Sequence, residues 1–417
     1  MPQRVVITGL GCISPVGNDV ETTWRNIVAG KSGAGLITRF NTDDFKVRIA
    51  AEVKGFNGGS LFGVKNARRM DRYTQFALAA ALQAQEDAEL EIHDDNRNRI
   101  GAVVGTGIGG MNTMSKQVDV FNSRGAARVS PFLVPMMIPD TGAATISIHL
   151  GLRGPSMAIV TACATGTNAV GEAAEIIRRG AVDVMFAGGS EAAVVPIAIA
   201  GLANMTALSR RNDEPERASR PFDKDRDGFV MGEGAAILIL ESYEHAVGRN
   251  ANILAEVVGY GSNSDAFHIS APAPDGEGAV LCMRQALDSA GLGIDDIDYI
   301  NAHGTSTPLN DASETTAIKR TFGERAYKIP ISSTKSMTGH LMGSSGALEA
   351  LFCVKVLENG VIPPTINYET PDENCDLDYV PNEAQQADME HVMSNSFGFG
   401  GHNATIIIKR TGNQTKQ

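Results

Sequence analysis

The sequence has few cysteines, no long apolar run and no excess of positive charge, and each absence excludes a class of protein. Five cysteines are scattered along the chain without a CxxC pair, so we expect neither a disulfide framework nor a zinc site, and the cytoplasm is the expected compartment. The longest near-apolar run, residues 192–203, contains a proline and is too short to span a bilayer. No secretory signal is visible at the start. A net charge of −12 argues against general nucleic-acid binding.

Composition and length indicate a globular protein of more than one domain. Hydrophobic residues make up 43% of the sequence and charged residues 20%, which excludes a mostly disordered chain. A length of 417 residues allows two or three domains. The 45 glycines indicate many turns and close backbone approaches.

Short apolar and β-branched runs alternate with helical stretches along the chain. We expect strands at residues 4–8, 100–104, 158–161, 182–187, 235–241, 253–260, 299–302, 329–332 and 404–409. We expect helices at residues 69–89, 166–179, 278–290, 311–321 and 346–358. Several of the strands are apolar throughout, as in strands covered on both faces. The alternation predicts an α/β fold with mostly parallel sheets.

A faint internal repeat suggests that the fold is built from two similar halves. TACATG follows the strand at 158–161 and leads into a helix, and STKSMTGHLMGSSG does the same after the strand at 329–332. The two helices share one spacing, from Gly166 to Gly180 and from Gly346 to Gly360. Chance matches of this quality occur in α/β proteins, so the repeat alone leaves the duplication open. The predicted division is a first half at 1–250, a second half at 251–412 and a polar tail at 413–417.

Cys163 stands where a thiol could act as a nucleophile. It lies between an apolar run and an expected helix, among small residues. The positive end of a helix dipole lowers the pKa of a thiol and favours the thiolate, and free backbone N–H groups there can hold an oxyanion. Most free cysteines are buried and inert, and we expect that of Cys12, Cys282, Cys353 and Cys375.

Two histidines occupy turns of the kind that carry active-site residues. His303 ends the apolar run YINA, and His340 lies in KSMTGHLMGSSG just before a helix. A lone histidine more often has a structural role. In an α/β fold, however, ligands bind at the carboxyl ends of the strands, so both histidines could face Cys163.

Further residues near these turns allow two interpretations each. Lys335 is either a solvated charge or the buried partner of a carboxylate, Asp311 or Glu314. Both carboxylates could instead simply favour the start of their helix. The loop NSFGFGG at 395–401 is either an ordinary turn or a flexible gate whose amides face the site.

Taken together, these motifs resemble the β-ketoacyl-acyl carrier protein synthases of the thiolase superfamily. The resemblance rests on TACATG around Cys163, NAHGTSTPLND around His303, SSTKSMTGHLMGSSGALE around His340, and NSFGFGGHN near the end. RVVITGLGCISPVGN, RPFDKDRDGFVMGEGA and IPPTIN fit as well, so it covers essentially the whole chain. The Cys–His–His set is typical of types I and II, and HGTSTPLND, KSMTGH and GTGIGG favour type II.

The resemblance implies a fold, an assembly and a reaction. The fold is a five-layered α-β-α-β-α arrangement of two duplicated halves, and the assembly is a homodimer. The enzyme is an acyltransferase of fatty acid biosynthesis: an acyl chain moves from acyl carrier protein to Cys163, and the carbanion from decarboxylated malonyl carrier protein attacks the thioester. The reaction needs no cofactor and no metal, and we expect neither a nucleic acid nor a membrane as partner.

The same resemblance implies roles for individual residues. The amides of Cys163 and Phe399 would form an oxyanion hole, and His303 and His340 would serve decarboxylation. The other implied roles are an orienting pair of Lys335 with Glu314, pantetheine binding by Thr305 and Thr307, substrate binding by Ser270 and Phe397, a pocket floor near Ile108 and a gate at Phe399.

An acidic enzyme that binds an acidic carrier protein needs a basic docking surface. The candidates are Lys65, Arg68, Arg69 and Arg128, together with the pair Arg210 and Arg211, each of which could equally be a solvated surface charge.

Two residues depart from relatives. Thr206 stands where some carry a basic residue, and His402 stands where others have threonine.

Three alternatives compete with this interpretation. A type I synthase or a type II polyketide ketosynthase would share the catalytic set. A chain-length-factor subunit typically lacks the nucleophilic cysteine, which is present here. A degradative thiolase would need a second catalytic cysteine near the C-terminus, which this sequence does not show.

Overall fold

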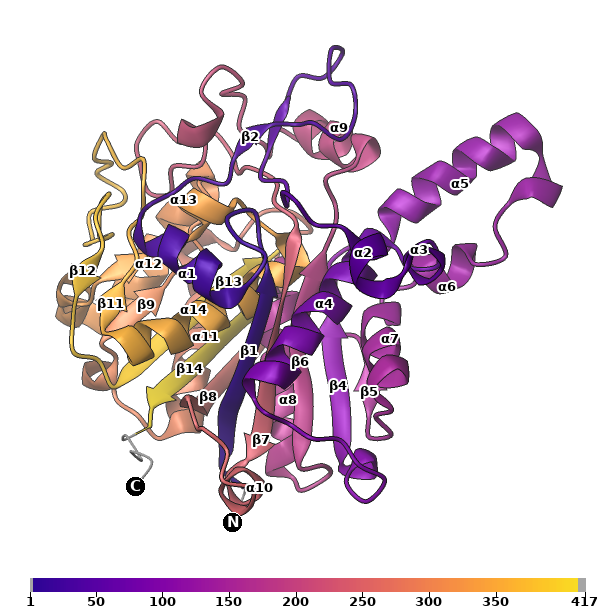
Figure 1. Ribbon diagram of the computed structural model, residues 1–417. Coiled ribbons are helices and arrows are strands. Elements are labelled where there is room, and N and C mark those ends of the chain that lie inside the picture. The colour runs from indigo at the N-terminus through magenta and orange to yellow at the C-terminus, as the bar shows by residue number, and fades with distance from the viewer. Residues whose placement is uncertain (1–2, 412–417) are drawn as a thin grey trace.

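The computed structural model describes residues 3–411, so the predicted polar tail at 413–417 lies outside the described residues. Ten strands form one continuous sheet in the order β10-β9-β13-β14-β8-β1-β7-β6-β4-β5 (Figure 1). Their bounds are Val5–Ile13 (β1), Ile100–Gly105 (β4), Ser156–Met157 (β5), Val184–Glu191 (β6), Gly234–Ser242 (β7), Ala255–Ser264 (β8), Tyr299–Asn301 (β9), Ile331–Ser332 (β10), His391–Gly398 (β13) and His402–Arg410 (β14). Two small sheets pair β2 (Gly35–Leu36) with β3 (Ile49–Ala50) and β11 (Val361–Ile362) with β12 (Gln385–Gln386).

The sheet consists of two halves with the same topology. In chain order the first half has β1, β4, β5, β6 and β7, and the second has β8, β9, β10, β13 and β14. In both halves the second strand is parallel to the third and fourth, the fifth is antiparallel to the fourth, and the first is antiparallel to the fifth. The halves join where β1 pairs with β8. The duplication expected from the sequence is therefore confirmed.

The expectation of mostly parallel sheets is wrong. Only the pairs β9/β10, β9/β13, β4/β5 and β4/β6 are parallel, and the other pairings of the large sheet are antiparallel. The strands are apolar throughout because helices cover both faces, and this burial pattern does not depend on strand direction. The last strand of the second half, β14, returns directly from β13 as a hairpin, with no crossover helix.

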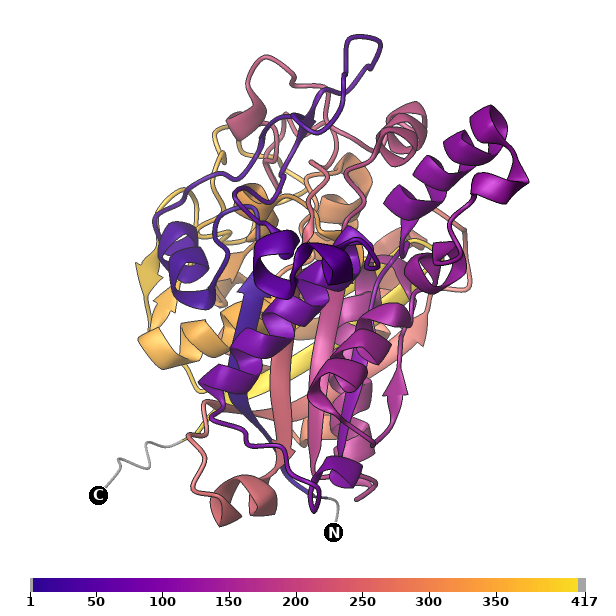
Figure 2. The same cartoon turned by 45° about the vertical axis from the view of Figure 1, so that its right-hand side comes forward.

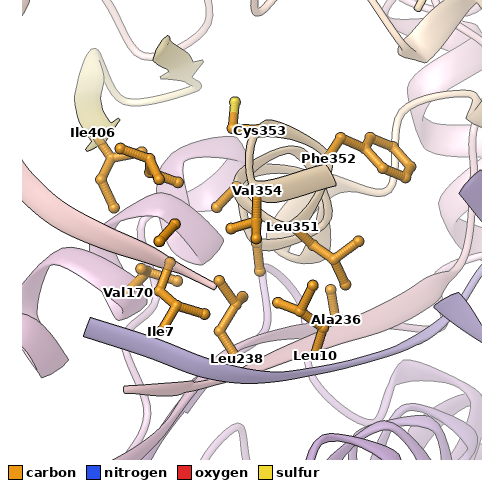
Figure 3. Close-up of a cluster of buried hydrophobic side chains, with 14 of the residues drawn as sticks. Ile7, Leu10, Val170, Ala236, Leu238, Leu351, Phe352, Cys353, Val354 and Ile406 are labelled. Atoms are coloured by element: carbon orange, nitrogen blue, oxygen red, sulfur yellow. The ribbon is translucent and has the colours of Figure 1, made fainter. Parts of the chain in front are cut away.

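Helices lie on the outer faces of both halves and between them, which gives five layers. Along β7, Ala236, Leu238 and Leu240 share a core with α8 (Thr165–Arg178) and α14 (Ser345–Asn359). The alternate residues Ala235, Ile237 and Ile239 pack with α4 (Arg72–Asp87) and α7 (Thr141–Leu150). The outer face of the second half packs against α11 (Glu277–Ala290) and α12 (Pro308–Phe322). Figure 3 shows the central layer, where Val170 of α8 and Val354 of α14 lie among strand residues of both halves.

Most predicted elements are present, with clear exceptions. The five predicted helices correspond to α4, α8, α11, α12 and α14. No strand forms at 158–161: the edge strand β5 ends at Met157, and the chain then runs past Gly105 toward the site. The unpredicted elements include β13, whose sequence HVMSNSFG is polar although most of it is buried. The remaining helices are α1 (Val20–Val28), α2 (Gly58–Phe62), α3 (Val64–Ala67), α5 (Met111–Arg124), α6 (Leu133–Met137), α9 (Pro196–Asn204), α10 (Tyr243–Gly248) and α13 (Lys335–Thr338).

The two central helices approach each other closely at their N-termini. A Cβ on Gly166 would lie 2.5 Å from the backbone nitrogen of Ala347, and a Cβ on Gly346 would lie 2.1 Å from Thr167 Oγ1. Only glycine permits this contact, which brings the turns that precede α8 and α14 together. Helix α5 extends from this body as a projecting arm (Figure 2). Among residues 3–411, no helix is both long enough and apolar enough to cross a bilayer.

Candidate active site

Cys163 lies in a 3₁₀ turn, η3 (Ala162–Ala164), directly before α8, and its side chain is buried. The preceding residue, Ala162, has a φ of 50°, which turns the chain sharply from the extended segment into the helix. The end of β13 packs on this turn. A Cβ on Gly398 would lie 3.0 Å from the backbone nitrogen of Cys163 and 2.9 Å from the carbonyl oxygen of Thr161. A glycine is required there, and it brings the neighbouring Phe399 amide close to the thiol.

His340 is held against the thiol from the other half of the fold. Its Nε2 lies 2.9 Å from Cys163 Sγ, and its Nδ1 lies 2.9 Å from Ser345 Oγ. Ser345 Oγ also accepts a hydrogen bond of 2.8 Å from the Leu341 N–H. Phe229 packs edge-on against the imidazole at 5.2 Å. These contacts fix the orientation of the imidazole ring, because they involve both of its nitrogen atoms and one of its faces.

His303 completes a compact group of three side chains. It follows β9, and its backbone N–H donates to Glu314 Oε1 at 2.8 Å. Its ring is edge-on to that of His340, with the centroids 5.4 Å apart. The Cys163 sulfur and one ring nitrogen of each histidine all lie within 4.8 Å of one another. The three side chains that the sequence singled out are therefore brought together.

Burial controls the protonation of this group. It lowers the pKa of His303 and of His340 well below the ordinary value, and the Lys335 charge acts in the same direction. Both imidazoles are therefore neutral near pH 7, and each has one N–H to donate. Burial also raises the pKa of Cys163 to about 12, although the Phe399 N–H and Lys335 oppose it. The expectation that the helix terminus lowers the pKa of Cys163 and favours the thiolate is wrong, because desolvation outweighs this effect.

Lys335 is buried, but its partner differs from the predicted one. Its ammonium forms an ion pair with Glu349 of α14, so the expected Lys335–Glu314 pair is wrong. The two oxygens of Glu314 are occupied by the N–H groups of His303 and Gly304, at 2.8 and 2.7 Å. Burial raises the pKa of Glu314 and of Glu349 to about 7, and Lys335 opposes the shift in both. Asp311, the other carboxylate considered, instead lies 3.6 Å from Arg226.

A pocket of about 430 Å³ opens onto the three catalytic candidates. Its walls include five residues expected to bind substrate or to gate the pocket, namely Thr305, Thr307, Ser270, Phe397 and Phe399. The hydroxyl groups of Thr305 and Thr307 lie 3.0 Å apart. Ile108 is not part of this wall, and packs instead against the apolar cluster that contains Cys163. The pocket can therefore present a bound group to the thiol and to two neutral imidazoles at once.

Comparison with known proteins identifies the family. A model described as "Beta-ketoacyl synthase, N-terminal domain" matches residues 2–246, and one described as "Beta-ketoacyl synthase, C-terminal domain" matches residues 254–369. The chain belongs to the β-ketoacyl synthase family. The resemblance seen in the sequence is thus confirmed, and the synthase is a condensing acyltransferase with the thiolase-like fold of this family.

Individual relatives cover nearly the whole synthase. A "3-oxoacyl-[acyl-carrier-protein] synthase 2" of Staphylococcus aureus (strain N315) is 53% identical over 98% of both chains. A solved β-ketoacyl synthase from Burkholderia phymatum STM815 is 37% identical, with a TM-score of 0.91 over 98% of this chain and 100% of that one. A chain of the solved complex AntDE:AntF, a type II polyketide synthase acyl-carrier protein with its ketosynthase, is 36% identical, with a TM-score of 0.91 over 99% of this chain and 100% of that one.

The predicted docking residues of the synthase lie on its surface, and none of them is among the residues that line the pocket. Lys65, Arg68, Arg69 and Arg128 are all exposed. Lys65 belongs to α3, and the Arg69 guanidinium lies 4.8 Å from the centre of the Phe132 ring. Arg210 is exposed and Arg211 half-buried, and Thr206 is an exposed residue at the pocket wall. His402 begins β14 next to Gly400 and is not among the residues that line the pocket.

Sequence reasoning missed several residues that orient the site of the synthase. Ser345 and Glu349 follow His340 and lie one turn apart on α14, the helix that faces η3. This spacing puts both side chains on one face of the helix, and that signal could have identified them. Phe229 lies in a loop and Glu191 ends β6, and both are distant in sequence from the motifs that identified the site. No local pattern points from them to the site, because their contacts are with His340 and Gly343 of the other half.

Proposed function

We propose that this β-ketoacyl synthase is a type II 3-oxoacyl-acyl carrier protein synthase that lengthens an acyl chain by two carbons in fatty acid biosynthesis. The observation that carries the proposal is the 2.9 Å contact between Cys163 Sγ and His340 Nε2, at a pocket that also contains His303. The division into halves at 1–250 and 251–412, each of which supplies part of this site, belongs to the same proposal.

The first half-reaction loads the enzyme. Cys163 Sγ attacks the thioester carbon of acyl carrier protein while neutral His340 takes the thiol proton, which avoids a free thiolate in a dry site. The amides of Cys163 and Phe399 hold the oxyanion of the tetrahedral intermediate. This intermediate collapses with loss of the carrier thiolate, which receives the proton from His340. The acyl chain then lies toward Ile108, with Phe399 as its gate.

The second half-reaction forms the carbon–carbon bond. Malonyl carrier protein binds with its pantetheine arm along Thr305, Thr307, Ser270 and Phe397, and loses its carboxyl group as CO₂. The N–H group of His303 and the Nε2–H group of His340 hold the enolate oxygen that develops, with His340 now in the tautomer whose Nδ1 accepts from the Ser345 hydroxyl. The enolate carbon attacks the acyl-Cys163 carbonyl and expels the Cys163 sulfur, which takes up a proton from water and returns to the thiol; the product is a β-ketoacyl carrier protein. The ion pair of Lys335 with Glu349 orients this region.

The degree of sequence identity to relatives favours a role in fatty acid biosynthesis over a role in polyketide synthesis. The Staphylococcus aureus synthase is 53% identical, whereas the chain matched in the polyketide complex AntDE:AntF is 36% identical. The latter was solved with its acyl-carrier protein, which supports a carrier protein as partner here, docked on the basic residues around α3. We further infer that the synthase works in the cytoplasm.

A homodimer is part of the same proposal. Strand β5 is the last strand of the sheet, so within the described chain one of its edges is unpaired. Met157 on this strand and the adjacent Ile148 and Val160 are 41%, 83% and 49% exposed. Exposed apolar residues at a sheet edge favour pairing with a second copy. Light scattering should give twice the monomer mass, and the double variant Met157→Lys/Val160→Lys should give the monomer mass.

Intact-mass spectrometry tests the proposed reaction. The enzyme is incubated with acyl carrier proteins that carry chains of different length, and the mass gained by the enzyme is then mapped to a residue. We expect one acyl group on Cys163 and, after addition of malonyl carrier protein, its release as a product two carbons longer. Acylation without elongation would contradict the proposed condensation.

A further inference from the structure

The second half contains a counterpart of the turn that bears Cys163, and this counterpart carries no nucleophile. Residues 162–166 (ACATG) and 342–346 (MGSSG) form the same 3₁₀ turn before α8 and α14. Ala162 and Met342 have φ values of 50° and 46°. Gly343 therefore stands where Cys163 stands in the first half. While the Cys163 turn borders the pocket, the N–H of Gly343 is bound by a buried carboxylate.

That carboxylate belongs to Glu191, the last residue of β6. Its Oε2 accepts hydrogen bonds from the N–H groups of Gly107 at 2.7 Å and of Gly343 at 3.1 Å, and its Oε1 accepts one from the Thr106 hydroxyl at 3.0 Å. The side chain is completely buried. A Cβ on Gly343 would lie 2.2 Å from the nitrogen of Gly107, so the two loops touch and share this one acceptor.

Both loops continue into residues of the active site. Gly107 is followed by Ile108, which packs against the cluster around Cys163. Gly343 lies between His340 and Ser345, the residue that contacts His340 Nδ1. We propose that Glu191 is a positioning residue of the condensing reaction, which ties these two loops together across the halves and so fixes His340 relative to the thiol.

The charge of Glu191 also acts on the thiol. It raises the pKa of Cys163, against the Lys335 ammonium, which lowers it. The two imidazoles next to the thiol, His303 and His340, are neutral near pH 7, so they do not oppose this charge. Burial raises the pKa of Glu191 itself to about 7, although the hydrogen bonds that it accepts lower it. Glu191 is therefore neutral below about pH 7 and suppresses the thiolate only above it.

Glu191→Gln separates the charge from the geometry. The glutamine oxygen can accept from the Gly107 and Gly343 N–H groups, and its amide can donate to the Thr106 hydroxyl. Alkylation of Cys163 by iodoacetamide, mapped by mass, is followed against pH for both proteins. We expect equal rates at pH 6, and at pH 8.5 a variant faster by at least about threefold, since the wild-type enzyme then carries the charge. A ratio that does not change with pH would overturn the proposal.

Glu191→Ala removes the acceptor and leaves two buried N–H groups unpaired. We expect acyl transfer to Cys163 to fall by about tenfold to a hundredfold, because small displacements of catalytic groups have effects of this size, and Glu191→Gln to restore most of it. A folded Glu191→Ala enzyme with the wild-type acylation rate would contradict the proposal. If this variant does not fold, the alkylation profile of Glu191→Gln decides alone.

Glu241→Gln is the matched control. Glu241 is an equally buried carboxylate on β7 that accepts from Arg249 and His245 far from the site. Its loss should reduce stability without changing the pH profile of Cys163 alkylation. The acyl-transfer measurement rests on the proposed function, whereas alkylation needs no carrier protein. A synthase that alkylates as expected but accepts no acyl group would therefore contradict the proposed function and not the role of Glu191.

Discussion

His340 Nε2 lies 2.9 Å from Cys163 Sγ, although 177 positions separate the two residues in the chain. Each belongs to the turn region before a central helix, one in each half of the fold. The contact depends on the close approach of α8 and α14, which Gly166 and Gly346 permit. The proposed nucleophile and the group proposed to take its proton are thus supplied by equivalent regions of a duplicated fold.

Replacement of Cys163 by serine should abolish acyl transfer. The hydroxyl is a weaker nucleophile than a thiol, and neutral His340 cannot compensate for this. Acylation measured by intact mass should be lost in Cys163→Ser and largely retained in Cys12→Ser and Cys353→Ser, which alter buried cysteines of the core. An acyl group mapped to any other cysteine would contradict the assignment of Cys163.

Removal of either partner of the Lys335–Glu349 pair should destabilise the synthase strongly. Both side chains are almost completely buried, and an unpaired buried charge costs about 3–5 kcal/mol. Chemical denaturation of Lys335→Met and Glu349→Gln measures the loss. Lys319→Met is the control: it breaks the half-exposed pair with Asp376, for which we expect less than about 1 kcal/mol. Equal losses in all three variants would show that burial of the pair does not matter.

The sequence predicts the positions that carry chemistry better than the contacts between them. Cys163, His303 and His340 were recognisable because each lies at a turn beside an apolar strand or a helix, which is a local pattern. The partner of Lys335 was not recognisable from the sequence, since Glu314 and Glu349 are both acidic residues on nearby helices. Only the packing of the halves shows that both carboxylate oxygens of Glu314 accept hydrogen bonds from backbone amides, whereas the carboxylate of Glu349 faces the Lys335 ammonium.

The same distinction applies to the fold. The helix preceding Gly360 and the helix preceding Gly180 were predicted because their apolar faces and terminal glycines are local signals. Strand direction was not predicted correctly, because apolar strands covered by helices on both faces have similar sequences whether they are parallel or antiparallel. Strand β13 was missed because it contains three buried polar residues, Ser394, Asn395 and Ser396, which depart from the usual apolar pattern of a buried strand.

Gly346→Ala should weaken both stability and activity. The new Cβ would lie 2.1 Å from Thr167 Oγ1, so α14 must move away from α8, at a cost of about 1–3 kcal/mol for overpacking. Since this shift separates His340 from Cys163, acylation should also slow. Gly201→Ala on α9 is the control, because no described atom lies within 4 Å of its added Cβ. That change should leave activity intact and raise helix stability slightly. A Gly346→Ala enzyme of normal stability would contradict the role of close helix packing.

The two histidines should differ in the half-reaction that they support. His340 touches the thiol, whereas His303 lies beside Thr305 and Thr307 at the wall where the malonyl group would bind. His303→Ala should therefore slow CO₂ release from malonyl carrier protein by about 10²–10³, the effect of losing one donor to a developing oxyanion, with less effect on acylation. His340→Ala should slow both steps. Single-turnover acylation and CO₂ release are measured separately for each variant. If His303→Ala slowed acylation as much as CO₂ release, His303 would have to act on the thiol itself, as part of the activation that the 2.9 Å contact assigns to His340 alone.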